Sequence, residues 1–158
     1  MPDRDQTEEQ PPPLEEIAPP RMSGGFGLDV ARVETGVDRP EDAYREAWDL
    51  LAARDPRTAL GLLEPALEQD PANTGLRSLR AWAYLLRAQL RRAEDDLRIL
   101  VDHGPDDVWA RHALGRALER QDRLTEALPH LRLAAAMSGD VEHEVAVLRV
   151  ERVLMTRG

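Results

Sequence analysis

Cysteine is absent from the sequence, so neither a disulfide framework nor a thiolate metal site can form. Lysine is absent as well: all 21 basic residues are arginine, a bias typical of GC-rich genomes to which we attach no mechanism. Aromatic residues make up only 4 % of the chain, whereas alanine and leucine are abundant. A chain with so few large rings favours helices that pack closely through small side chains.

Positive charge is also scarce. The net charge of −9 opposes non-specific binding to nucleic acid, which requires basic surface against the phosphates. No apolar run approaches the ~20 residues needed to cross a bilayer. The N-terminus lacks the basic segment and apolar core of a secretory signal. We therefore expect a cytoplasmic protein whose partners include neither nucleic acid nor a membrane.

The patterns of common active sites are missing too. No two of the four histidines have the i,i+4 spacing of a helical metal site. The glycines at 24–27 lack the lysine and the spacing of a phosphate loop, and none of the three serines lies in a nucleophile elbow. The Glu142-His143-Glu144 run is best interpreted as surface charge. The sequence predicts no catalytic residue, no metal ligand and no cofactor.

A repeat with a fixed period of 34 dominates what is present. Two columns hold small side chains and a third holds leucine, and these columns are Ala47/Ala81/Gly115, Ala59/Ala93/Ala127 and Leu63/Leu97/Leu131. Pro71, Pro105 and Gly139 form a further column of residues that end helices. A fixed period in the 20–50 range indicates stacked units, and the small columns allow two antiparallel helices in each unit to approach closely.

This register resembles the tetratricopeptide repeat family, which has a small residue at unit position 8, alanine at 20 and proline at 32. The units are 40–73, 74–107 and 108–141, about two thirds of the chain, and Leu114-Gly115 matches the family's Leu-Gly at positions 7 and 8. Position 4, usually large and apolar, departs from the pattern with Ala43, Arg77 and Arg111. The resemblance implies an all-α fold, a right-handed solenoid of three helical hairpins.

Segments on either side of the 40–141 array have other roles. Residues 1–39 are rich in proline and carboxylates and carry a net charge of −5, so we expect a disordered tail. Residues 142–158 are expected to form a capping helix, beginning near 141 after an N-cap at Asp140. We predict that this helix covers the last unit with one face, made of Val141, Val145, Leu148, Arg152 and Met155.

The resemblance also implies a concave groove lined by the first helix of each unit. Carried over position by position, its candidate residues are Tyr44, Trp48, Leu51, Ser78, Trp82, Leu85, Trp109, His112, Arg116 and Arg120. Trp48 and Trp82 have two interpretations, exposure in the groove or filling of gaps between neighbouring first helices. The family's lysine- and asparagine-based clamp for a C-terminal carboxylate has no counterpart here.

Non-catalytic protein–protein binding is the function that these features favour, with a peptide or a partner helix in the groove. The alternatives are a self-associating structural protein, which leaves both monomer and homodimer open, and a regulatory subunit of a larger complex. We expect a ligand with an apolar anchor and acidic residues for Arg116 and Arg120. The chain's own tail fits this description at 13–20 and at 26–34, although the second piece also has the composition of a linker.

Overall fold

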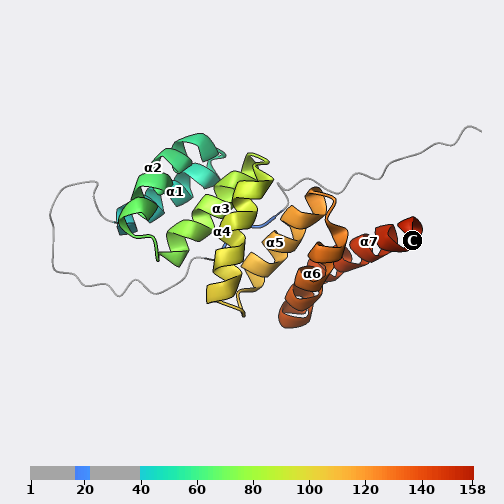
Figure 1. The fold of residues 1–158 in the computed structure, drawn as a ribbon. Helices are drawn as coiled ribbons and strands as arrows, with labels where there is room; N and C mark the ends of the chain where they lie inside the picture. The colour runs from blue at the N-terminus through green and yellow to red at the C-terminus, as the bar shows by residue number, and fades with distance from the viewer. Residues whose placement is uncertain (1–16, 22–39) are drawn as a thin grey trace, which may run out of the picture.

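The computed structural model describes residues 17–21 and 40–158. The predicted disordered tail falls mostly on 1–16 and 22–39, and its second ligand-like piece, 26–34, lies entirely outside the described residues. Residues 40–158 form seven helices and no strand, in the order α1 (Pro40–Ala52), α2 (Pro56–Gln69), α3 (Thr74–Leu86), α4 (Leu90–His103), α5 (Val108–Arg120), α6 (Leu124–Ser138) and α7 (Val141–Arg157). Successive hairpins stack side by side along the array (Figure 1), which confirms the all-α solenoid. None of these helices is long and apolar enough to cross a membrane.

Hairpins begin at a constant interval because the same signals recur. Helices α1, α3 and α5 start at Pro40, Thr74 and Val108, which follow the period of the repeat. Side chains of Asp55, Asn73, Asp107 and Asp140 accept hydrogen bonds from backbone N–H groups in the first turns of α2, α3, α5 and α7. These bonds satisfy donors that a helix start leaves unpaired, as predicted for Asp140.

The turn inside each hairpin uses one left-handed residue. Arg54, Ala88 and Asp122 have φ values of 63°, 53° and 59°, and their positions follow the same period. In each turn the next residue donates its N–H to the carbonyl five residues earlier, at 2.8 to 3.0 Å. These bonds have the spacing of a Schellman C-cap, which favours glycine at the left-handed position. None of the three residues is glycine, so residue type alone does not predict these turns.

The predicted small columns lie where the two helices of a hairpin touch. All three alanines of the second column and all three leucines of the third are fully buried. Gly115 replaces alanine in the third unit because a Cβ there would lie 2.6 Å from two carbons of the Leu131 side chain. The 3.3 Å approach to the carbonyl oxygen of Ala127 leaves little room for relief. The third hairpin therefore packs more closely than a Cβ at this position allows.

Arginine at unit position 4 has a structural reason. The guanidinium of Arg77 donates to the carbonyl of Pro71 at 2.6 Å, and that of Arg111 donates to the carbonyl of Pro105 at 2.5 Å. Both carbonyls belong to the loop before the helix that carries the arginine. The departure from the family pattern thus ties each of these first helices to the preceding loop.

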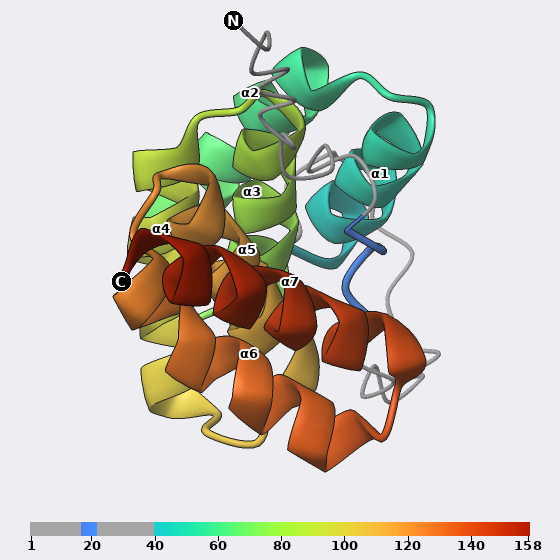
Figure 2. The ribbon, with the colours of Figure 1, turned by 90° about the vertical axis from the view of Figure 1, so that its right-hand side faces the viewer.

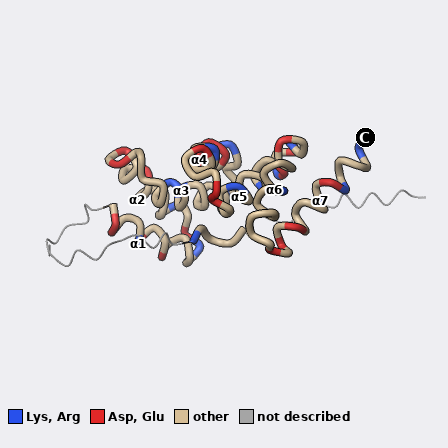
Figure 3. The backbone as a smooth tube through the Cα atoms, turned by 90° about the horizontal axis from the view of Figure 1, so that it is seen from below, with Lys and Arg blue, Asp and Glu red and all other residues tan. Residues whose placement is uncertain are grey.

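The charged run of α4 at 91–98 has the composition of a solvated face, and the structure corrects this interpretation. Glu94 and Asp96 are only 7 % and 2 % exposed. Asp96 accepts hydrogen bonds from Arg77 and Arg80 of α3, at 2.7 to 3.0 Å. Glu94 pairs with Arg98, as its i,i+4 spacing predicts, and it also pairs with Arg123 in the next unit at 2.7 Å. Figure 3 shows acidic and basic residues close together around α4.

The face of α7 that covers the array also differs from the prediction. Val141, Val145, Leu148 and Met155 are between 51 % and 83 % exposed. Ala146 and Val150 are buried instead, with Val153 and Leu154 partly buried against the core. One residue corresponds to about 100° of rotation on an α-helix, so the packing face is displaced by one position from the predicted stripe. Helix α7 caps the array, but it leaves an apolar stripe in solvent.

Candidate functional site

Four helices contribute to the candidate site. Helix α1 packs against α3, and α5 packs against α7. Figure 2 shows α1 and α7 on the same side of the array, with residues 17–21 running between them. The predicted groove residues on α1 and α3 form one end of this surface, and those on α5 form the other.

An aromatic cluster occupies the first end. The ring centroids of Tyr44 and Trp48 are 6.5 Å apart, and those of Trp48 and Trp82 are 5.7 Å apart. Tyr44 also covers Gly75, where a Cβ would lie 3.3 Å from the ring. Tyr44 is 6 % and Trp82 7 % exposed, whereas Trp48 is partly exposed. Gap filling between first helices is therefore the correct interpretation for Trp82, and Trp48 keeps part of its indole at the surface.

Three further residues of the predicted groove present little free side-chain surface to a ligand. Leu51 is fully buried and Leu85 is 2 % exposed, and both belong to the hydrophobic core. This corrects the sequence prediction, since a side chain in the core has no surface to present. The hydroxyl of Ser78 donates to the carbonyl of Thr74 at 2.9 Å, within its own helix. Arg120 is exposed at the end of α5.

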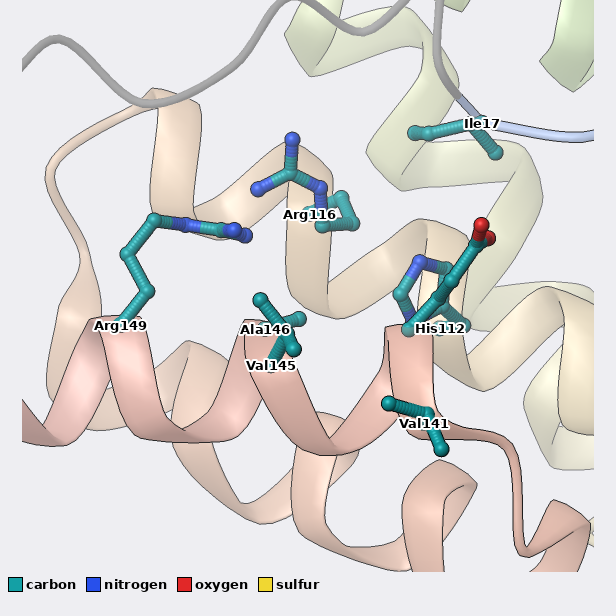
Figure 4. A pocket seen from close by; sticks show the side chains of 8 residues that line it. Ile17, His112, Arg116, Val141, Val145, Ala146 and Arg149 are labelled. Carbon is teal, nitrogen blue, oxygen red and sulfur yellow. The ribbon is translucent and has the colours of Figure 1, made fainter.

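A pocket of about 580 Å³ lies at the other end, between α5 and α7. It is lined by Ile17, His112, Arg116, Val141, Glu142, Val145, Ala146 and Arg149 (Figure 4). Next to it, the indole N–H of Trp109 donates to the backbone carbonyl of Ala18 at 2.7 Å. The predicted residues Trp109, His112 and Arg116 thus come together around a segment that lies far earlier in the chain.

Two arginines that line this pocket share one buried carboxylate. Arg116 and Glu119 are 3 % and 5 % exposed and form an ion pair. Glu119 also accepts hydrogen bonds from Arg149 of α7 at 2.6 and 3.1 Å. One buried carboxylate therefore joins two guanidinium groups and ties α5 to α7. Arg116 is buried and paired, but two guanidinium groups share one carboxylate, so the expectation that Arg116 attracts acidic residues of a ligand stays a prediction.

His112 forms the uncharged part of the pocket. Its ring stacks on that of His143, with centroids 4.1 Å apart, and among the described residues its buried Nδ1 has no hydrogen-bond partner. Burial is the main cause that lowers the pKa of His112 to about 3. His143, Arg116 and Arg149 act in the same direction, whereas Asp140 opposes them. At neutral pH the pocket therefore presents a neutral imidazole.

This pKa predicts a loss of stability in mild acid. The unfolded chain binds a proton at His112 near pH 6.5, but the folded chain does so only near pH 3. Stability contributed by neutral His112 is therefore present above pH 6.5 and lost as the pH falls. Linkage gives about 1.4 kcal/mol per pH unit, hence about 2 kcal/mol between pH 7 and 5.

Urea unfolding at both pH values measures this loss. His112→Phe carries no titrating group at this position, so its stability should fall by about 2 kcal/mol less than that of wild type over the same range. Equal losses in both proteins would contradict the assignment.

Helix α7 supplies site residues that the sequence analysis assigned only to capping. One further step of 34 from Arg111, His112 and Gly115 leads to Val145, Ala146 and Arg149. All three line the pocket, because α7 takes the place that the first helix of a fourth unit would occupy. The sequence signal that identifies these three residues is therefore the 34-residue period, continued by one step beyond the third unit. Within 17–21 and 40–158, no group of three His, Asp or Glu side chains is arranged to hold a metal ion.

Comparisons with known proteins agree with this geometry. The Arabidopsis OM64 TPR domain is similar with a TM-score of 0.67 and 22 % identity, over 72 % of this chain and 94 % of that chain. The first TPR of Spaghetti (RPAP3), bound to the HSP90 peptide SRMEEVD, gives 0.70 and 17 % over 78 % and 99 %. A MamA structure (MSR-1) gives 0.68 and 17 % over 77 % and 70 %. At these identities the likeness is one of fold. No curated protein sequence matches the chain.

Two models of the tetratricopeptide repeat match the sequence itself, at residues 50–107 and 79–141. Both matches fall on the hairpins whose small columns, turns and caps recur with a single period. Together they span 50–141, which is more than half of the chain, and the protein belongs to the tetratricopeptide repeat family.

Proposed function

We propose that the protein is a non-catalytic interaction module of the cytoplasm, and that its concave surface binds an extended peptide segment of another protein. The observation that carries this proposal is the indole N–H of Trp109, which donates to a peptide carbonyl next to the pocket between α5 and α7. A fixed donor to the peptide backbone beside a pocket for a side chain is the arrangement by which proteins bind extended peptides.

The size and chemistry of the pocket support a peptide ligand. Its volume of about 580 Å³ lies in the range of roughly 300 to 1,000 Å³ that is usual for ligand sites. The arginines in its wall, Arg116 and Arg149, both pair with Glu119, and Glu142 is exposed to solvent, so an apolar side chain can enter without separating a buried ion pair. A solved relative in fold, the first TPR of Spaghetti, is bound to a peptide, which supports the same class of ligand.

Peptide display on the full chain tests this proposal. Peptides selected against wild type should bind Trp109→Ala at least about tenfold more weakly, since anchor residues contribute ~1.4 kcal/mol or more. The matched control is Ile99→Ala, which removes an apolar side chain of 38 % exposure from α4 on the outer row. Equal affinity for wild type and Trp109→Ala, or a loss confined to Ile99→Ala, would place binding elsewhere.

Self-association is a second candidate, favoured by the exposed apolar stripe of Val141, Val145, Leu148 and Met155 on α7. A second copy could cover this stripe as the next unit of an array would. Light scattering across a wide concentration range tests it. A mass of 17.7 kDa at every concentration would exclude this candidate, and a rise that Leu148→Asp abolishes would support it.

A further inference from the structure

Residues 17–21, of sequence Ile-Ala-Pro-Pro-Arg, alternate between contact and exposure. Ile17 is 4 % exposed and Pro20 is buried, whereas Ala18, Pro19 and Arg21 are exposed. A spacing of three between the contacting residues matches the three-residue turn of a polyproline II helix. The segment has no α-helical residue. It therefore presents one side, Ile17 and Pro20, to the array.

Two independent contacts hold this segment. The side chain of Ile17 lies in the wall of the pocket with His112, Arg116 and Ala146 (Figure 4). Trp109 donates its indole N–H to the carbonyl of the following residue, Ala18. One contact selects a side chain and the other a backbone group, which is how an extended peptide acquires both specificity and direction. Neutral His112 and the paired charges of Arg116 leave this pocket compatible with an aliphatic side chain.

We propose that the surface around the pocket between α5 and α7 recognises an extended segment in which a branched aliphatic residue is followed three positions later by proline. Residues 17–21 are the resident ligand of this surface, and Ile17 forms one wall of the space that stays open. A partner segment with the same chemistry competes with this tail for the pocket. That competition rests on the proposed function, whereas occupation of the pocket by the tail does not. A partner segment must therefore bind tightly enough to displace the tail.

Covalent attachment allows the tail to occupy the site even when its intrinsic affinity is weak. Residues 22–39 connect the segment to α1, and covalent attachment through a linker gives an effective concentration of millimolar order. For a peptide of intrinsic dissociation constant K that matches the tail's own, the apparent constant in wild type is K plus this concentration. A peptide with K of about 0.3 mM would then bind wild type several-fold more weakly than a variant whose tail is released. Pro19 and Pro20 reduce the conformational entropy that binding removes.

The indole N–H signals of the full chain test occupation of the pocket. Ile17→Asp places a carboxylate in the wall of the pocket, whereas the matched control Arg21→Gln lowers the net charge by the same one unit on an exposed side chain. We expect the Trp109 indole signal to shift in Ile17→Asp and to stay in place in Arg21→Gln. The indole signal of buried Trp82 should be unchanged in both variants, which verifies the fold. Identical Trp109 signals in all three proteins would overturn the proposal.

A synthetic peptide of residues 13–21, PLEEIAPPR, tests recognition in trans. It should saturate the Ile17→Asp variant, return the Trp109 signal towards its wild-type position, and bind wild type several-fold more weakly. Equal binding to wild type and variant, or no saturable binding to the variant at several millimolar, would overturn the proposal. The Trp109 signal reports the tail whether or not displayed peptides bind, so failure of the proposed function remains distinguishable from failure of this inference.

Discussion

Replacing Glu119 by glutamine is expected to lower the free energy of unfolding by about 3–5 kcal/mol, the usual cost of removing one partner from a buried ion pair. Glu119 is 5 % exposed and joins Arg116 of its own helix to Arg149 of α7. Glutamine keeps the shape but removes the charge, so two guanidinium groups lose the carboxylate that they share in a buried position. The contact between α5 and α7 should weaken first, since this carboxylate connects the two helices.

Urea unfolding of the full chain measures this effect. Glu126→Gln is the matched control, because Glu126 also pairs with two arginines, Arg98 and Arg123, but its side chain is 51 % exposed. Water and salt screen such a pair, and we expect little change in the unfolding midpoint. Equally small losses in both variants would contradict the role assigned to Glu119.

Truncating Trp82 to alanine is expected to cost about 3–5 kcal/mol of stability, as for other buried large aromatic residues. Trp82 packs against Trp48 between α3 and α1 and is 7 % exposed. The sequence left two interpretations of this side chain open, exposure in the groove or filling of the gap between first helices. Its burial makes the same substitution a test of packing, since the cavity would open between two first helices.

Comparison with Trp109→Ala separates the two roles. Trp109 is partly exposed at the other end of the surface, so its truncation should destabilise the chain less and weaken peptide binding more. Urea unfolding of both variants, followed by helical circular dichroism, provides the comparison. If Trp82→Ala unfolds at the wild-type urea concentration, Trp82 is not part of the core.

The hairpins were predictable because the contacts between the two helices of a unit recur every 34 residues. A small residue is required wherever two helices of a unit approach closely, and Ala59, Ala93 and Ala127 mark those contacts directly in the sequence. The left-handed turn residues were not predictable. Arg54, Ala88 and Asp122 adopt positive φ without being glycine, since backbone hydrogen bonds of the turn impose that conformation.

The candidate site was only partly predictable. His112 lines the pocket and Trp109 lies next to it, but Leu51 and Leu85 lie in the core. A first helix has a packing face and a groove face about 100° apart, and the register alone does not fix where one ends. The same one-residue rotation separates the predicted stripe of α7 from the face that is buried.

Buried charge was the feature least visible in the sequence. Glu119 and its partner Arg149 are 30 residues apart, and Asp96 and Arg77 are 19 apart. Sequence spacing identifies only pairs three or four residues apart on one helix, such as Glu94 and Arg98. Pairs between helices depend on how the hairpins fold and stack, so sequence spacing does not identify them.

Cross-saturation mapping of a selected peptide on the full chain tests most directly whether the concave surface binds peptides. The account predicts saturation transfer at Trp109, Val145 and Ala146, with no transfer to exposed Ile99 and Leu133 on the outer helices α4 and α6. It also predicts that Ile17→Asp strengthens the transfer, because the tail no longer occupies the pocket. Transfer centred on α4 and α6, with Trp109 unaffected, would contradict the account.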